Sequence, residues 1–260
     1  MMFLPAPEQN HAEEFAAKRL TSPYGLISAM VNGHNGILNL LVIGNAFACN
    51  QANLIYTTFA SFIREFHVLC LEACVDLPLS EACEDRINYS ALLDKLRPDY
   101  IFILARSHNP TVVGNILKED AIFVESLQQL NLFSKRAQKV YVLRPLPPCQ
   151  LRCASYAMFR TRGDFVAKLG NNFMVYKDFD GRETVDQAIH GCTNCEVVDY
   201  LNVFTSAITN FLGFVPSTNR MVLNDENNLN QYGLEVVLPV YERISNDLRR
   251  RFEPELNQHQ

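Results

Sequence analysis

The chain has 260 residues, 48% of them hydrophobic and 20% charged, which excludes a disordered protein and predicts one or two globular domains. With 23 Lys and Arg against 28 Asp and Glu, the net charge of -5 argues against non-specific binding to nucleic acid, so we expect no nucleic-acid partner. No run of 18 or more apolar residues is present, and the first eight residues lack the basic region and apolar length of a signal peptide. We therefore expect neither a signal peptide nor a transmembrane segment in this chain.

Apolar runs of strand length alternate with stretches of helical periodicity, the pattern of β-α-β units around a mostly parallel sheet. The predicted strands are Ile37–Ile43, Val68–Leu71, Tyr100–Ala105, Val140–Leu143, Glu196–Tyr200 and a short apolar run at Met221–Leu223. The predicted helices span about 48–66, 115–133 and 150–168, followed by a last helix with an apolar face from Leu234 to Leu248. Pro239 lies inside that last pattern and is expected to kink the helix or delay its start.

This pattern predicts one α/β domain over residues 35–252. Residues 1–34 are expected to form an N-terminal lead-in, and residues 253–260 a polar tail. No internal repeat or low-complexity segment interrupts the domain.

The chain has eight cysteines, many for a cytosolic protein and few for a secreted one. Cys192 and Cys195 form a C-x-x-C motif, which could be a redox pair, half of a zinc site with His190, or a local disulfide. Zinc needs further ligands and no second motif is spaced to supply them, so we expect no metal and no cofactor. The chain also contains one N-glycosylation sequon, Asn88-Tyr89-Ser90, which is about as many as chance predicts for a chain of this length.

In open parallel sheets, sites form at the carboxyl ends of strands beside the helix that follows. The segment from Gly44 to Gln51 occupies that place after the first predicted strand, and the amides of the following helix would favour an anion or oxyanion there. Its single glycine fits neither a G-x-G-x-x-G motif nor a P-loop, so phosphate binding is not indicated.

The segment LLVIGNAFACNQANLIY resembles the first block of SGNH hydrolases, in which a strand ends in G-D-S or G-N-S and the serine attacks an ester. It is most similar to the SGNH domains fused to acyltransferase 3 family membrane proteins in animals. RPDYIFILAR, CTNCEVVDYL and NDENNLNQYGLEVV support the resemblance in order and spacing, over residues 10–248. It implies a three-layer α/β/α sandwich with a mostly parallel five-stranded sheet.

Carried over by position, the resemblance implies that the catalytic groups are lost. Gly44 and Asn45 match the turn, but Ala46 stands at the nucleophile position and has no hydroxyl. Asp225 matches the family aspartate, whereas Asn228 replaces the histidine base, and an amide cannot take up a proton near neutral pH. The expected catalytic set is therefore not intact, and the chain is interpreted as a pseudoenzyme of an acyltransferase or esterase family.

Three residues are candidates to replace the lost groups. Ser107 and His108 follow the predicted strand at 100–105, where a displaced nucleophile and base could sit, although a surface histidine is the simpler interpretation. Cys49 lies one turn beyond Ala46 and could serve as a thiol nucleophile, although a free cysteine is usually a small buried hydrophobe.

The resemblance also implies two structural disulfides. It pairs Cys74 with Cys83 and Cys192 with Cys195, which would place the chain in an oxidising compartment on the lumenal or extracellular face of a membrane system. The absence of a recognisable signal peptide points instead to the cytosol.

Three functions remain open from the sequence. The first is a binding or regulatory module for an acylated glycan or lipid, acting with a membrane acyltransferase domain or protein. The second is an active O-acyltransferase or carbohydrate esterase with a relocated nucleophile. The third is a structural domain without a ligand.

Overall fold

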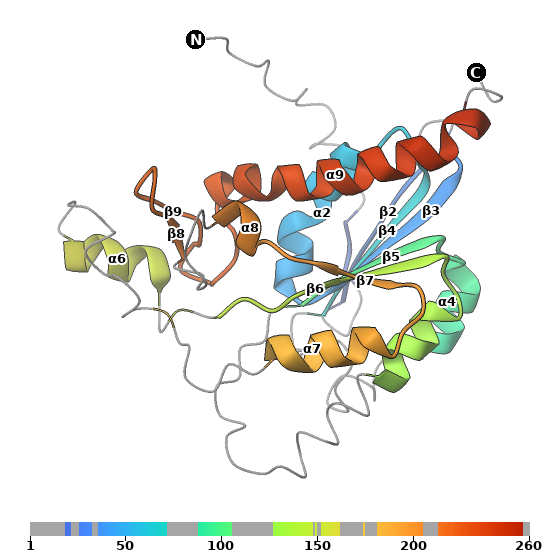
Figure 1. Ribbon diagram of the computed structural model, residues 1–260, viewed down its shortest axis with the longest axis horizontal. Coiled ribbons are helices and arrows are strands. Elements are labelled where there is room, and N and C mark those ends of the chain that lie inside the picture. The colour runs from blue at the N-terminus through green and yellow to red at the C-terminus, as the bar shows by residue number, and fades with distance from the viewer. Residues whose placement is uncertain are drawn as a thin grey trace.

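The structure is a computed structural model, and it describes residues 19–21, 26–32, 36–71, 88–105, 127–147, 149, 152–161, 174, 181–204 and 213–256. Its centre is a seven-stranded sheet in the order β1-β2-β4-β3-β5-β6-β7 (Figure 1). The strands are β1 Arg19–Thr21, β2 Leu26–Asn32, β3 Leu38–Gly44, β4 Ile63–Leu71, β5 Tyr100–Leu104, β6 Lys139–Leu143 and β7 Cys195–Val198.

Five of these strands, β4-β3-β5-β6-β7, pair in parallel. In chain order their arrangement is 2-1-3-4-5, the doubly wound order in which the direction of winding reverses beside the first strand. β3 and β5, at the centre of the parallel part, are buried along their whole length, as expected for strands covered by helices on both sides. The predicted α/β fold with a five-stranded parallel sheet is confirmed.

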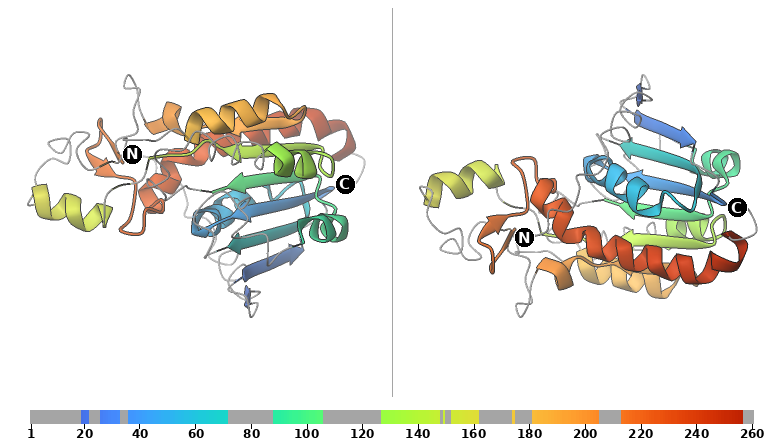
Figure 2. Two further views of the ribbon diagram at one scale, coloured as in Figure 1. Left: turned by 90° about the horizontal axis from the view of Figure 1, so that it is seen from below. Right: turned by 90° about the horizontal axis from the view of Figure 1, so that it is seen from above.

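The sheet continues beyond its parallel part through an antiparallel pair of strands. β2 pairs antiparallel with β4, from Leu26 opposite Leu71 to Asn32 opposite Glu65, and β1 pairs antiparallel with β2. Figure 2 shows both strands at the edge of the sheet remote from the C-terminal helix. The segment expected to be a lead-in thus contributes two strands to the sheet.

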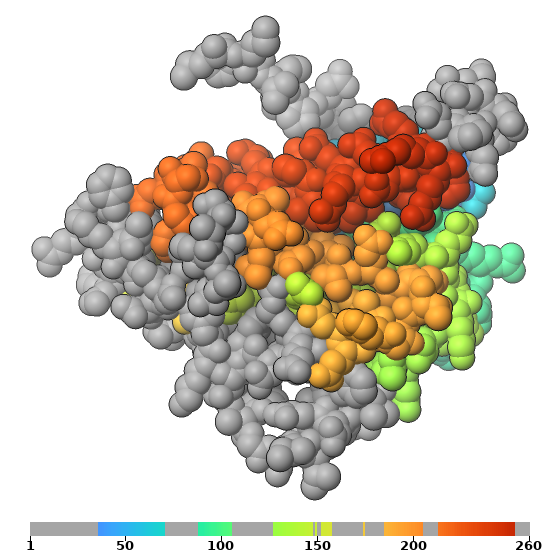
Figure 3. Space-filling view, viewed as in Figure 1, coloured from blue at the N-terminus to red at the C-terminus, as the bar shows by residue number. Residues whose placement is uncertain are grey.

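One face of the sheet is covered by α2 (Ala46–Phe59) and α9 (Gln231–Leu256). Figure 3 shows α9 lying along the upper side of the molecule. Its predicted apolar face is buried at Val237, Tyr241, Ile244 and Leu248. The helix continues through Pro239, whose side chain is exposed, and extends to Leu256 in the segment expected to be a tail.

The opposite face of the sheet is covered by α4 (Tyr89–Leu96), a helix over 127–134, and α7 (Gly181–His190). Tyr89, Leu93, Phe133 and Val185 pack there in a second apolar cluster, separate from the one under α2 and α9. Two apolar clusters on the two faces of one sheet give the three-layer sandwich that the sequence predicted.

The predicted helix over 48–66 is wrong at its C-terminal end. α2 ends at Phe59, Phe62 lies in the turn, and Phe66 belongs to β4. Both phenylalanines are buried, as residues on the apolar face of a helix would be. They belong to a turn and a strand, so the match of their spacing to helical periodicity is a coincidence.

Short elements extend the carboxyl edge of the sheet. They are α6 (Cys153–Thr161), α8 (Leu201–Phe204) and a two-stranded sheet of β8 (Phe214–Val215) and β9 (Arg220–Met221). No helix in the described part of the chain has the length and apolar character needed to cross a membrane.

Candidate functional site

The turn between β3 and α2 occupies the carboxyl edge at the centre of the parallel sheet. Gly44 ends β3 beside Leu104 of β5, and a Cβ at this position would lie 2.0 Å from the Leu104 carbonyl oxygen. Only glycine fits this close approach. The requirement comes from strand packing, and it leads the chain directly into the start of α2.

Asn45 caps α2. Its backbone is extended, with φ -87° and ψ -161°, and its side-chain oxygen accepts a hydrogen bond from the Phe47 amide at 3.1 Å. Ala46 follows as the first residue of the helix and is exposed. The structure therefore presents the methyl group of Ala46 at the N-terminal end of the helix dipole, the position at which the resemblance implies a serine hydroxyl in active relatives.

A second loop, residues 224–230, contains Asp225 and Asn228, which the resemblance places at the aspartate and histidine positions of the family. Asn224 stabilises the loop through three hydrogen bonds. Its side-chain oxygen accepts from the backbone amides of Glu226 at 2.9 Å and of Asn228 at 3.0 Å, and its backbone amide donates to the Asn228 carbonyl at 2.9 Å. Asn227 adopts a left-handed conformation with φ 62°, which asparagine tolerates well.

This loop is attached to α2 one turn beyond Ala46. The Asn50 side-chain amide donates to the Leu229 carbonyl at 3.0 Å. This contact joins residues 179 positions apart in the sequence. It brings the turn at Ala46 and the loop that contains Asn228 to one edge of the sheet. Asn228 supplies a half-buried amide side chain there, without a group that could act as a general base.

Asp225 is engaged by α6. One carboxylate oxygen accepts from the Ser155 amide at 2.7 Å, and the other accepts from the Ser155 hydroxyl. The Ser155 hydroxyl, followed by the Ser155 amide, holds the pKa of the Asp225 carboxyl below its usual range. An aspartate expected to orient a histidine therefore interacts with the first turn of a neighbouring helix. Sequence reasoning missed Ser155, which lies 70 residues away from Asp225 in the chain.

The start of α6 is fixed by two further contacts. The Cys149 amide donates to the Asn227 side-chain oxygen at 2.8 Å, and a disulfide joins Cys149 to Cys153, with Cα atoms 5.8 Å apart. The 224–230 loop is therefore held between α2 on one side and the α6 segment on the other.

The cysteines correct one expectation. Cys49 forms a disulfide with Cys70 of β4, with Cα atoms 5.8 Å apart. A disulfide sulfur carries no thiolate, so the structure contradicts Cys49 as a substitute nucleophile. Cys192 and Cys195 are also joined, with Cα atoms 5.4 Å apart, as the resemblance implied.

Several expected positions lie outside the described residues: Ser107, His108, Cys74 and Cys83. His190 lies at the end of α7 and its Nδ1 contacts the Asp186 carbonyl at 2.6 Å. Within the described ranges, no three His, Cys, Asp or Glu side chains gather as metal ligands would.

A buried polar cluster that the sequence did not reveal lies behind the first turns of α2. The Gln51 side-chain oxygen accepts from the Tyr200 hydroxyl at 2.5 Å and from the Tyr241 hydroxyl at 3.0 Å, and the two hydroxyls contact each other. Burial raises the pKa of both phenols. The cluster joins α2, α9 and the segment after β7, so it fixes the helix that carries residue 46.

An ion-pair network lies at the same edge of the sheet. Arg144, directly after β6, donates to Asp186 of α7 at 2.6 Å and to Asp199 after β7 at 2.6 Å. Because Arg144 is neutralised by two carboxylates, it serves to position the ends of β6 and β7.

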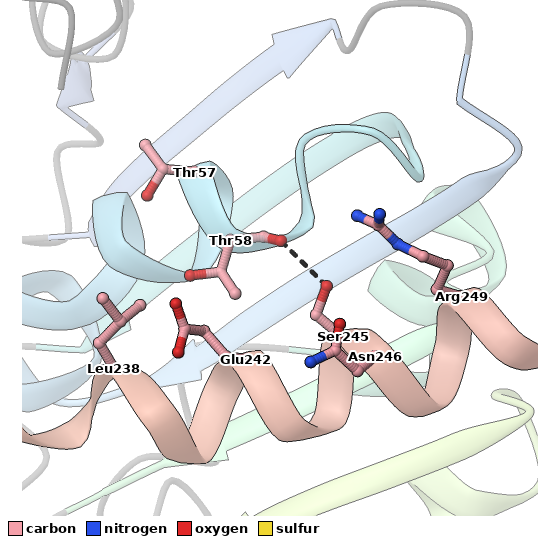
Figure 4. A pocket seen from close by; sticks show the side chains of 7 residues that line it. All are labelled: Thr57, Thr58, Leu238, Glu242, Ser245, Asn246 and Arg249. Carbon is pink, nitrogen blue, oxygen red and sulfur yellow. Dashed lines mark hydrogen bonds between the residues drawn. The ribbon is translucent and has the colours of Figure 1, made fainter. Parts of the chain in front are cut away.

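A polar pocket of about 510 Å³ lies elsewhere, between the C-terminal half of α2 and the middle of α9 (Figure 4). Its lining residues are Thr57, Thr58, Leu238, Glu242, Ser245, Asn246 and Arg249. Within it, the Ser245 hydroxyl donates to the Thr58 carbonyl at 3.1 Å. The lining includes none of the expected catalytic positions, Ala46, Asp225 and Asn228.

Taken together, the doubly wound sheet, the glycine-containing turn at residue 46 and the 224–230 loop attached to α2 define an α/β domain of the SGNH hydrolase type. The family model "SGNH domain (fused to AT3 domains)" matches residues 14–243. The chain belongs to this family of acyltransferase- and esterase-like domains.

Two solved structures are similar to this chain at low sequence identity, and the first of them shares its fold. The periplasmic domain of the lipopolysaccharide acetyltransferase of Salmonella ser. Paratyphi A is 11% identical, with a TM-score of 0.57, covering 83% of this chain and 85% of that chain. A catalytic mutant of an acetylxylan esterase from Geobacillus stearothermophilus is 9% identical, with a TM-score of 0.48, covering 83% and 95%. Comparison with curated proteins gave no match.

Proposed function

We propose that this chain is a catalytically degenerate SGNH domain that binds an acylated glycan or lipid without cleaving it. The observation that carries the proposal is Ala46, which stands exposed at the start of α2 on a turn whose glycine and asparagine cap are both retained. A turn that keeps its geometry while the reacting group is missing suits binding better than turnover.

The chemistry argues against hydrolysis at residue 46. An alanine cannot form an acyl-enzyme, and the asparagine at 228 cannot accept the proton that a nucleophile would release. In a serine protease, losing the triad lowers kcat by about 10⁶, and the oxyanion contacts left behind retain only roughly 10³- to 10⁴-fold over water. What remains in this domain is a place for a carbonyl oxygen at the N-terminus of α2.

The ligand class follows from the family and from that placement. An ester carbonyl would accept from the amides at the start of α2, and the glycan or lipid part would extend along the carboxyl edge of the sheet. Because the family consists of domains fused to AT3 domains, we propose a membrane acyltransferase domain or protein as the partner. The disulfides in the described residues support a lumenal or extracellular position.

Thermal unfolding in the presence of ligands tests this function. The probes are an O-acetylated oligosaccharide, the same oligosaccharide after deacetylation, and a lysophospholipid. A ligand at 100 times its Kd stabilises the folded state by about 2.7 kcal/mol, which raises Tm by roughly 5–10 °C for a domain of this size. We expect the shift with an acylated probe and none with the deacetylated one.

A matched pair of variants locates the binding. Ala46→Asp places a carboxylate where the carbonyl oxygen would bind, and an aspartate in the first turn favours the helix itself. Ala91→Asp makes the same change at an exposed position in the first turn of α4, on the other face of the sheet. The proposal expects the shift to disappear in the first variant and to persist in the second.

Two results would overturn the proposal. One is an unchanged Tm with all acylated probes. The other is covalent labelling of the wild-type chain by a fluorophosphonate at Ser107, which would favour an active esterase or acyltransferase with a relocated nucleophile.

A further inference from the structure

The sequon Asn88-Tyr89-Ser90 forms the start of α4. Asn88 is exposed and is the N-cap of the helix, because its side-chain oxygen accepts a hydrogen bond from the Ala91 amide at 2.9 Å. Tyr89 turns the other way: it is 4% exposed and packs edge-on against Phe133, with ring centroids 5.7 Å apart. The buried tyrosine fixes the helix start so that the asparagine faces solvent.

The two atoms of the Asn88 amide have different environments. The oxygen is used by the cap, whereas within the described part of the chain no protein group accepts a hydrogen bond from the nitrogen. A substituent on Nδ2 would leave the hydrogen bond to the Ala91 amide in place. The folded domain is therefore compatible with a bulky group on this nitrogen.

We propose that Asn88 is an N-glycosylation site of this protein. In this modification, an oligosaccharyltransferase transfers an oligosaccharide from a polyprenyl-pyrophosphate donor to the asparagine side chain. The bond between C1 of the first sugar and the pyrophosphate oxygen breaks, and a bond forms between that carbon and Nδ2. Polyprenyl pyrophosphate leaves, and the proton lost from Nδ2 balances the reaction.

The order of events follows from Ser90. Its hydroxyl, which the sequon requires, accepts a hydrogen bond from the Arg136 guanidinium at 2.8 Å, and the same guanidinium pairs with Asp94 at 2.8 Å. Since Arg136 lies 46 residues further along the chain, this contact forms only after the intervening chain has been made. Glycan transfer thus precedes the docking of α4.

The disulfides supply an independent argument for the compartment. The structure joins Cys49 to Cys70, Cys149 to Cys153 and Cys192 to Cys195, and the described residues contain no free cysteine. Disulfides persist in the secretory lumen, where oligosaccharyltransferase also acts. The glycan would lie over α4, on the face of the sheet opposite α2, so it would leave the turn at residue 46 open.

The test is translation of the full chain, behind a secretory leader, in the presence of endoplasmic-reticulum microsomes. An Asn-Gly-Thr tag added at the C-terminus reports delivery into the lumen, and only protease-protected chains that carry the tag glycan are scored. The proposal predicts a second glycan on the wild-type chain. Peptide N-glycosidase F should remove it and leave aspartate at position 88, which peptide mass spectrometry reads directly.

Three variants separate the glycan from the fold. Asn88→Asp keeps a capping oxygen but loses the acceptor nitrogen, and it should carry the tag glycan alone. Ser90→Thr keeps a hydroxyl and should retain both glycans, whereas Ser90→Ala should lose the one at Asn88. Wild-type chain that carries only the tag glycan, or a second glycan that persists in Asn88→Asp, overturns the proposal.

Discussion

The disulfide between Cys49 and Cys70 permits a quantitative prediction. It joins the first turns of α2 to the end of β4 across a sequence separation of 21 residues. In the chain-entropy treatment, closing a loop of this length lowers the entropy of the unfolded chain enough to stabilise the folded state by about 3.4 kcal/mol at 25 °C. The variant Cys49→Ala/Cys70→Ala should lose this amount and lower Tm by roughly 7–14 °C.

A second pair of cysteines provides the control. Cys192 and Cys195 are separated by only 3 residues, so the same treatment gives about 1.9 kcal/mol for the variant Cys192→Ala/Cys195→Ala. Urea unfolding of both variants and the wild type, monitored by circular dichroism, measures the difference. A loss in the first variant no larger than in the second would refute the reasoning from loop length.

Three further predictions concern the elements around the site. Gly44→Ala should lower the free energy of unfolding by about 1–3 kcal/mol or more, because its Cβ would clash with the Leu104 backbone. Gly191→Ala should cost less, because the close contact of its Cβ, at 2.7 Å, is with the end of the flexible Leu127 side chain. Urea unfolding that ranks the two in the reverse order would contradict this. Tyr241→Phe should reduce the loss of stability that the wild type shows above about pH 10. Burial raises the pKa of the Tyr241 phenol in the folded state, so the phenol ionises first in the unfolded chain. Its contribution to stability is therefore complete below the unfolded pKa of about 10 and is lost as the pH rises above that value. Identical pH profiles of unfolding for variant and wild type would count against it. Ser155→Ala should raise the pKa of Asp225 toward its ordinary value, because the hydroxyl is the largest cause of the shift, and a carboxyl resonance that titrates unchanged in NMR would disprove that cause.

The centre of the parallel sheet could be predicted from the sequence because its strands, β3 and β5, are short, apolar and fully buried. Leu38–Gly44 and Tyr100–Leu104 carry runs that read as strands without any tertiary information. The turn at residue 46 was located in the same way, since it follows the first such run and precedes a helix. The long C-terminal helix was equally clear from its apolar face.

Elements that depend on partners distant in sequence were missed or misplaced. β2 and its edge partner are stabilised by pairing with β4, and α4 and α7 are short helices stabilised by packing on the sheet. Local periodicity carries little information about such elements, because tertiary contacts decide whether they form.

The same distinction between local and distant contacts separates the site residues that the sequence predicts from those that it does not. Gly44, Asn45 and Ala46 are adjacent in the chain, so one block of sequence identified them. The contact of Asp225 with Ser155 joins residues 70 apart, and the Cys49 to Cys70 disulfide joins residues 21 apart. Neither separation leaves a spacing pattern that a single sequence can reveal.

Hydrolysis of an aryl acetate by the wild-type chain and by Ala46→Ser/Asn228→His tests the central claim most directly. A carboxylate has about four acceptor sites, so Asp225 retains acceptor capacity beside its bonds to Ser155. We expect the wild type to exceed the uncatalysed rate by no more than roughly 10³- to 10⁴-fold. The rate of the double variant should be higher by about a further 10²-fold, and adding Asp225→Asn to the double variant should reduce this increase. Turnover by the wild type equal to that of the double variant, or a double variant no faster than the wild type, would contradict the claim that this domain retains the scaffold of an SGNH enzyme without its chemistry.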